Sequence, residues 1–312
     1  MANKIDEQAY QEAVQLANRL IIEKKYQEAF PFLKKWYEQQ PTWQFNYLLV
    51  QVCFLQGNFT EALTYAKEWL DEYRETTQGR MLYLQVILMN QQFLQGWIFL
   101  YPLATSFNLG EEREFLVKME ELLASNSPQF LNEKREQLRN FLAMDQYVHS
   151  TAFNNWMVGL TSTQFREIVV PAIQEPTNSS CIARICEILV KIGADETISV
   201  YDILTHQTRS VEFGKLELLE KTTIFEKLAQ TIADQVTKEP SLEESVLQEL
   251  LGHFAYCFPF LPDENELVDW VTVYLADFLQ VPLAKNDTQK EKWQVIAEKK
   301  QKIRNYFAKA LM

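Results

Sequence analysis

Glycine and proline are scarce in this chain of 312 residues, which holds 8 glycines and 10 prolines. Low glycine disfavours β-sandwiches and β-barrels, which need many tight turns, and it disfavours the glycine-rich loops that hold nucleotide phosphates. It favours helices, because glycine weakens a helix interior. Apolar residues make up 47% of the chain and aromatic residues 13%. That composition is sufficient for a large buried core, so we expect a mainly α-helical, folded protein.

Sequence motifs of catalysis and of metal binding are also missing. The chain has no G-x-G-x-x-G, no G-x-x-x-x-G-K-[ST], no H-E-x-x-H and no G-x-S-x-G. Its three histidines, His149, His206 and His253, show no paired ligand spacing, and Cys181 and Cys186 do not form a C-x-x-C motif. We therefore expect no enzymatic activity, no catalytic residues, no cofactor and no metal.

The cysteines and the apolar segments indicate a compartment. Four cysteines occur, and each lies in an apolar neighbourhood, as in Val52-Cys53-Phe54 and Tyr256-Cys257-Phe258. This pattern is typical of buried, reduced thiols. No signal peptide is recognisable after Met1, and no apolar run approaches the length of a membrane span. The sequence predicts a soluble, cytoplasmic protein without a membrane span.

Negative charge dominates, with a net charge of −12. An acidic protein repels a nucleic acid backbone, so no nucleic acid partner is expected. The charge is uneven: residues 161–284 carry 8 Lys or Arg against 20 Asp or Glu, whereas residues 285–312 carry 8 against 3. Two interpretations stay open. The basic tail folds back onto the acidic body, or it offers a basic handle to an acidic partner or a membrane.

The first third of the chain contains a repeat of about 33 residues. An aromatic residue followed three positions later by a small residue recurs in Lys25–Ala29, Asn58–Ala62 and Gln92–Gly96, at intervals of 33 and 34 positions. A repeat of this length predicts stacked helical hairpins. The aromatic residue would pack under the first helix of each hairpin, and the small residue would let the two helices approach closely.

These residues resemble the tetratricopeptide repeat over about residues 10–106. The resemblance implies a three-unit α-hairpin solenoid in residues 1–106, with a concave groove lined by the first helix of each unit. The third unit departs from the pattern, because Gly96 replaces the usual alanine and Pro102 falls inside its second helix.

The same resemblance implies which side chains line the groove. Two rows of amides would recur at the repeat period, and amides both donate and accept hydrogen bonds, so they suit the backbone of a bound peptide. Apolar residues would lie between the rows. The alternative is a solvated polar face that binds nothing. The implied partner-binding residues are Gln11, Val14, Asn18, Gln44, Tyr47, Gln51, Gln78, Met81 and Gln85.

The remainder of the chain reads as a second helical domain, residues 107–312, with one β-hairpin near 197–213 and a basic C-terminal helix. The strand signal is alternation in Thr197–Tyr201 and again in Ser210–Phe213, around a turn-like segment Thr205–Thr208. A two-stranded hairpin is marginally stable alone, so it must pack on helices.

The order of these elements is also similar to an uncharacterised family of tetratricopeptide-like proteins from low-GC Gram-positive bacteria. The similarity rests on the order of four features: the N-terminal repeats, the helix entry Leu160–Gln164, the strand pair Ile198–Phe213 and the segment Tyr256–Pro259. A departure is Asn178–Ser180, where a His-Pro pair is expected. The resemblance implies no known activity.

The sequence predicts a protein-interaction or scaffold module that binds a peptide or helix of an unidentified protein in the N-terminal groove. The alternative is a regulatory adaptor that uses the basic C-terminal helix for an acidic partner or nucleic acid. Trp97, Tyr101 and Phe107 need covering at the degenerate third repeat. Cover by the chain's own C-terminal half is expected more than cover by a second subunit, so a monomer is expected rather than a dimer.

Overall fold

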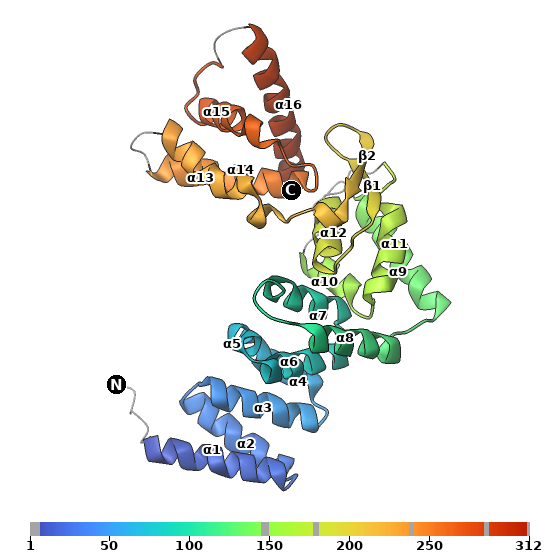
Figure 1. Ribbon diagram of the computed structural model, residues 1–312, viewed down its shortest axis with the longest axis vertical. Coiled ribbons are helices and arrows are strands. Elements are labelled where there is room, and N and C mark those ends of the chain that lie inside the picture. Colours follow the sequence, from blue (N-terminus) through green and yellow to red (C-terminus); the bar gives the residue numbers. More distant parts are fainter. Residues whose placement is uncertain (1–6, 145–149, 177–180, 237–239, 284–286, 311–312) are drawn as a thin grey trace. The chain divides into compact units, whose positions relative to one another are not determined.

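The computed structural model describes residues 7–144, 150–176, 181–236, 240–283 and 287–310 (Figure 1). Within these ranges the chain forms sixteen α-helices and one two-stranded antiparallel sheet. The prediction of a mainly α protein with one β-hairpin is confirmed. The chain divides into two compact units: Met1–Ser125 with Val158–Thr161, and Asn126–Met157 with Ser162–Met312. The predicted domain boundary at residue 106 therefore lies inside the first unit.

All secondary-structure elements in the described part of the first unit are helices. Helix α3 contacts both α1 and α6, and α6 also contacts α8. Between them α2 packs on α1 and α3, while α4 packs on α3 and α6. Its helices are α1 (Glu7–Ile22), α2 (Tyr26–Gln39), α3 (Trp43–Leu55), α4 (Phe59–Lys67), α5 (Leu70–Glu75), α6 (Thr77–Met89), α7 (Phe93–Leu100), the 3₁₀ turn Tyr101–Leu103 and α8 (Gly110–Leu123).

The turns after α1, α3 and α6 share one backbone conformation. Lys24, Gly57 and Gln91 all have positive φ, at 58°, 80° and 57°. In each turn the next residue donates its N–H to a carbonyl five positions earlier, at 2.9, 2.9 and 3.0 Å. This is the Schellman arrangement that ends a helix with a left-handed residue. The three turns are 33 and 34 residues apart, so the repeat in the sequence is also a repeat in local structure.

The small residues of the repeat lie at close helix contacts. Ala29 and Ala62 are fully buried, as the pattern predicts. Gly96 on α7 is buried too, and a Cβ there would lie 2.5 Å from Cδ2 of Leu116 on α8. The departure from alanine in the third unit thus has a packing reason. Pro102 lies beyond α7, in the 3₁₀ turn, rather than inside the second helix as predicted.

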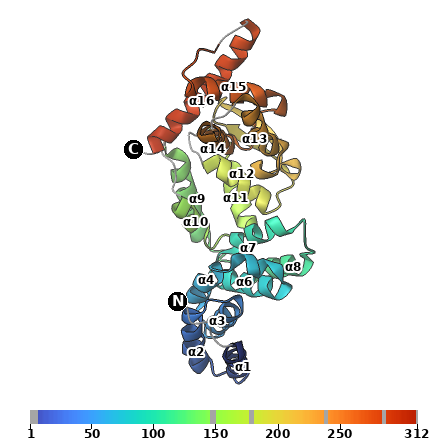
Figure 2. The same ribbon diagram turned by 90° about the vertical axis from the view of Figure 1, so that its left-hand side faces the viewer.

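The second unit contains the remaining helices and the sheet. Its elements are α9 (Pro128–Ala143), α10 (Ser150–Met157), α11 (Ser162–Ala172), α12 (Cys181–Lys191), β1 (Thr197–Asp202), β2 (Gln207–Glu212), α13 (Thr223–Gln235), α14 (Pro240–Cys257), α15 (Leu267–Phe278) and α16 (Asp287–Ala310), with 3₁₀ turns at Phe213–Lys215, Leu219–Lys221 and Glu264–Glu266. The helices α13 to α16 group together in both views (Figures 1 and 2). They share a core that includes Leu228, Leu250, Phe254, Trp270 and Tyr274.

The β-hairpin lies where the alternation predicted it, with a shorter turn. Thr197 pairs with Glu212 and Asp202 with Gln207, so β2 begins within the segment expected to be a turn. His206 lies in that turn with φ of 57°. The Asp202 carboxylate accepts hydrogen bonds from the backbone N–H groups of Leu204 and Thr205, which stabilises the turn. Tyr201 N–H of β1 donates to the carbonyl of Ile173, which directly follows α11, at 2.8 Å.

All four cysteines are buried, and no disulfide links them. Burial raises the pKa of the Cys53 thiol and of the Cys257 thiol to about 12 each, because a thiolate is poorly solvated in apolar surroundings. The prediction that these thiols act as small buried hydrophobes is confirmed.

Candidate functional site

The three glutamines of the first predicted row all lie exposed on the first unit. Gln11 on α1 donates its side-chain amide to Glu7 Oε1 at 3.1 Å. Gln44 on α3 accepts from the Tyr10 hydroxyl at 3.1 Å, a bond that joins α1 to α3. Gln78 on α6 is exposed and forms no side-chain hydrogen bond within the described chain.

The three amides of the second row differ in exposure and in hydrogen bonding. Asn18 is exposed, and its amide donates to the Val14 carbonyl of its own helix at 2.9 Å. Gln51 and Gln85 are half-buried, and neither finds a side-chain hydrogen-bond partner among the described residues. The amides of the two rows that form no side-chain hydrogen bond within the described chain are therefore on α3 and α6. We call the exposed side of α1, α3 and α6 that carries these six residues the amide face.

The apolar positions between the rows are not equivalent. Val14 is only 5% exposed and belongs to the core, so it offers little surface to a ligand. Tyr47 is half-buried, with its ring 5.5 Å from that of Trp43, and burial raises the pKa of its hydroxyl. Met81 is half-buried and packs against the same core as Tyr47. Tyr47 and Met81 could therefore present apolar surface, whereas Val14 is a packing residue.

The amide face is nearly free of charge on two of its helices. The segment Trp43–Leu55 contains no Asp, Glu, Lys or Arg. The only charged residue of α6 is Arg80, which is 3% exposed. Arg80 Nε donates to Glu112 Oε1 of α8 at 2.7 Å, and its other nitrogens bond to the Arg74 carbonyl and to Thr77. A ligand on α3 and α6 would consequently meet amides and apolar groups rather than charges.

A further row continues the amide face and was not predicted. Ile22, Leu55 and Met89 are the last residues of α1, α3 and α6, each four positions after an amide of the second row. Ile22 is 80% exposed and Leu55 43%, while Met89 is half-buried. The repeat period gave the signal, since these residues are again 33 and 34 positions apart. A four-residue step from the second row would have found them.

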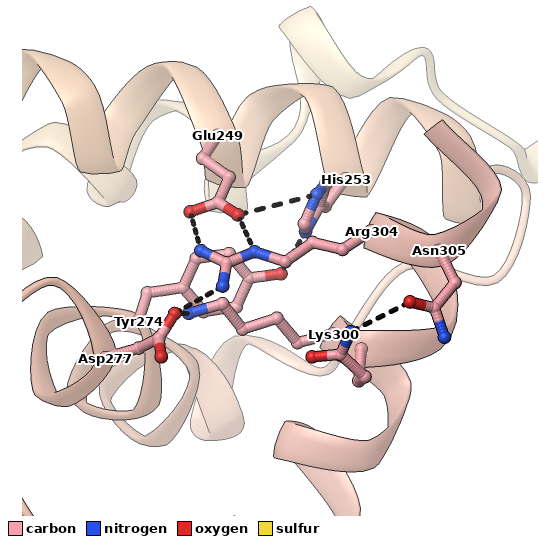
Figure 3. Close-up of polar contacts among 8 residues, drawn as sticks. Glu249, His253, Tyr274, Asp277, Lys300, Arg304 and Asn305 are labelled. Atoms are coloured by element: carbon pink, nitrogen blue, oxygen red, sulfur yellow. Dashed lines mark hydrogen bonds and ion pairs between the residues drawn. The ribbon is translucent and has the colours of Figure 1, made fainter. Parts of the chain in front are cut away.

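A second polar cluster joins α14, α15 and α16 in the second unit (Figure 3). Arg304 of α16 donates two hydrogen bonds to Glu249 of α14, at 2.5 and 2.9 Å, and also bonds to Asp277 of α15. Lys300 donates to Asp277 at 2.8 Å and lies 4.2 Å from the centre of the Tyr274 ring. Ion pairs of this cluster therefore link the three helices.

His253 lies inside this cluster and is kept neutral. It is 5% exposed, its Nδ1 shares a hydrogen bond with the Tyr274 hydroxyl, and its Nε2 is 3.8 Å from Glu249. Burial lowers the pKa of His253 to about 4, against a smaller opposing effect of Glu249. Burial also lowers the pKa of Lys300. The mutual pairing of these groups explains how such polar side chains tolerate the helix contact.

The cluster bears on the two interpretations of the basic tail. Lys292, Lys300 and Arg304 of α16 pair with acids of α14 and α15: Lys292 with Asp269, Lys300 with Asp277, and Arg304 with Glu249 and Asp277. These cations are turned toward the chain's own acidic groups.

Two features named from the sequence, His149 and the segment Asn178–Ser180, lie outside the described residues.

Two of the aromatic residues at the third repeat contact other elements of the first unit: Trp97 contacts α8 and Phe107 contacts α6. The Trp97 indole N–H donates to Glu120 at 2.9 Å, and the Arg80 guanidinium lies 4.7 Å from the centre of the Phe107 ring. Trp97, Tyr101 and Phe107 are half-buried.

The chain matches no protein-family model, no curated protein and no solved structure. Among the described helices, none is both long enough and apolar enough to cross a bilayer. Nor does the described part of the chain bring three or more His, Cys, Asp or Glu side chains together as a metal ion would require.

Proposed function

We propose that this protein is an interaction module whose first unit is a tetratricopeptide-like array, and that the amide face binds a peptide or helix of another protein. The observation that carries the proposal is the accessibility of Gln51, Gln78 and Gln85, which have no hydrogen-bond partner among the described residues. Each such amide can both donate to and accept from a peptide backbone.

The repeated geometry supports the proposal. The side-by-side packing of α1, α3 and α6 and the three matching turns present equivalent positions at a regular interval. A rigid surface of this kind leaves most of the ordering cost of binding to the ligand. The proposed setting is the reducing cytoplasm, which four buried cysteines without a disulfide support.

A screen of a random peptide library displayed on phage would test the proposal on the full chain. Enriched peptides should bind the wild-type protein, and binding should weaken at least about tenfold in the variant Q51A/Q78A/Q85A, because three pairs of hydrogen bonds are lost. The matched control is Q27A/Q39A, which removes exposed glutamines of α2 away from the amide face. If no peptide is enriched, or if both variants bind like the wild type, the proposal is wrong.

The basic helix is the weaker candidate for a binding site, because three of its cations already have acidic partners. The two candidates differ in their response to salt. Peptide binding at the nearly uncharged surface of α3 and α6 should change little between low and high salt, whereas binding through a basic helix should weaken steeply.

A further inference from the structure

A small cavity in the second unit has the features of a ligand site independent of the amide face. Its volume is about 180 Å³, which is room for a molecule of about ten non-hydrogen atoms. The walls come from the β-hairpin, from the start of α12, from the segment that follows α14, and from α15 and α16. Five aromatic residues line it: Tyr201, Tyr256, Phe258, Phe260 and Trp270.

One residue of the cavity wall, Trp270, has a buried polar atom without a partner. Trp270 is 2% exposed, and its indole Nε1 has no hydrogen-bond acceptor within the described residues. An indole N–H is a donor only, so its burial without an acceptor costs free energy. An acceptor atom on a bound molecule would remove that cost.

A cation on the cavity wall also lacks a partner. Lys299 of α16 lines the cavity and is half-buried, and it forms no hydrogen bond or ion pair with a described residue. It differs in this from Lys292, Lys300 and Arg304 of the same helix, which all pair with acids. An ammonium group partly removed from water favours an anionic partner.

Four other charged residues line the cavity, and two of them, Asp202 and Arg209, already interact with other groups of the chain. The buried Asp202 carboxylate accepts from two backbone N–H groups and lies 3.4 Å from Arg209. The Arg209 guanidinium lies 4.5 Å from the centre of the Phe260 ring. Asp263 is exposed and Glu266 half-buried, and these two carboxylates are the groups that would oppose an anion.

We infer that this cavity binds a small organic carboxylate with a flat apolar body. The aromatic walls would hold the apolar body, while Lys299 and the Trp270 indole N–H would hold the carboxylate oxygens. The Trp270 indole N–H is the buried group at this wall without a partner, and it is a donor, so it favours an acceptor such as a carboxylate oxygen.

Three probes of nearly equal size separate the alternatives: benzoate, its neutral amide benzamide, and the cation benzylamine. Ligand-observed NMR on the full chain should show saturation transfer to benzoate and at most weak transfer to the other two. The Trp270 indole ¹H–¹⁵N signal, assigned from its loss in Trp270→Phe, should shift on addition of benzoate. Tighter binding of benzylamine would show that Asp263 and Glu266 dominate, and would overturn the inference.

Variants of two lysines on α16 complete the test. K299M keeps the apolar stem and should weaken benzoate binding by about tenfold, the effect of losing one partly buried charge contact. K290M removes an exposed lysine of the same helix that does not line the cavity, and it should bind benzoate like the wild type. Absence of benzoate binding at millimolar concentration, or equal weakening by both variants, would contradict the inference.

Discussion

Gly96 on α7 faces Leu116 on α8 so closely that a Cβ on the glycine would lie 2.5 Å from Leu116 Cδ2. Leu116 is fully buried, so its side chain has little freedom to move aside. The two residues thus form a matched contact in which the absence of one side chain makes room for the other.

This contact predicts that Gly96→Ala destabilises the protein. Overpacking costs about 1–3 kcal/mol, while the better helix propensity of alanine returns about 1 kcal/mol, so a net loss of roughly 1 kcal/mol is expected. Urea unfolding of Gly96→Ala, Leu116→Ala and the double variant would measure it. In the Leu116→Ala background the alanine should become neutral or stabilising. An equal cost in both backgrounds would mean that the Leu116 contact is not the cause.

Asn46 should be essential to the contact between the first two hairpins. Its fully buried amide donates to the Tyr37 hydroxyl and the Tyr65 carbonyl, and it accepts from the Tyr73 hydroxyl. Asn46→Ala leaves the buried Tyr73 hydroxyl without its acceptor and removes one hydrogen bond each from the Tyr37 hydroxyl and the Tyr65 carbonyl. The change should cost about 2–4 kcal/mol in the free energy of unfolding.

The matched control for this change is Asn18→Ala. Asn18 is exposed and bonds only to a carbonyl of its own helix, so its loss should stay within about 0.5 kcal/mol. Chemical denaturation of both variants compares them directly. Similar costs for the two would show that the buried network contributes little.

The Arg80–Glu112 pair should behave as a buried ion pair, with side chains only 4% and 1% exposed. Removal of one partner, as in Glu112→Leu, should destabilise the protein by about 3–5 kcal/mol, because Arg80 would stay buried and charged. The double variant Arg80→Met/Glu112→Leu should recover much of the loss. Thermal unfolding of the three variants tests this, and a double variant as unstable as the sum of the single changes would contradict it.

Stability should fall as pH drops from about 6.5 to about 4, because of His253. Its folded-state pKa of about 4 lies below the model-peptide value of 6.5, so the unfolded chain binds the extra proton in this window. Stability is at its full value above pH 6.5, and the loss by pH 4 should reach roughly 3 kcal/mol.

The comparison for this prediction is His253→Gln, which cannot titrate. Urea unfolding at several pH values should show a shallower slope in the variant between pH 4 and 6.5. Below that window the lowered pKa of Asp277, whose carboxylate accepts from Lys300, adds its own loss in both proteins. An identical slope in wild type and variant would exclude His253 as the source.

Local patterns determined much of this molecule. The recurrence of an aromatic and a small residue placed the three matching turns, and the alternation in Thr197–Tyr201 placed the hairpin. Such features follow from neighbours along the chain, because helix and strand periods and the left-handed turn are local preferences. The resemblance to the tetratricopeptide repeat implied an accessible face carrying Gln11, Gln44 and Gln78, and all three are exposed.

Tertiary structure alone decided which polar groups meet. Residues 249, 277 and 304 are far apart in sequence, and no spacing could reveal that Arg304 would bond to both Glu249 and Asp277. The same holds for Leu116 filling the space at Gly96, and for Lys299 and Trp270 lining one cavity. These contacts depend on the packing of separate helices, and the free energy of that packing is not encoded in any local period.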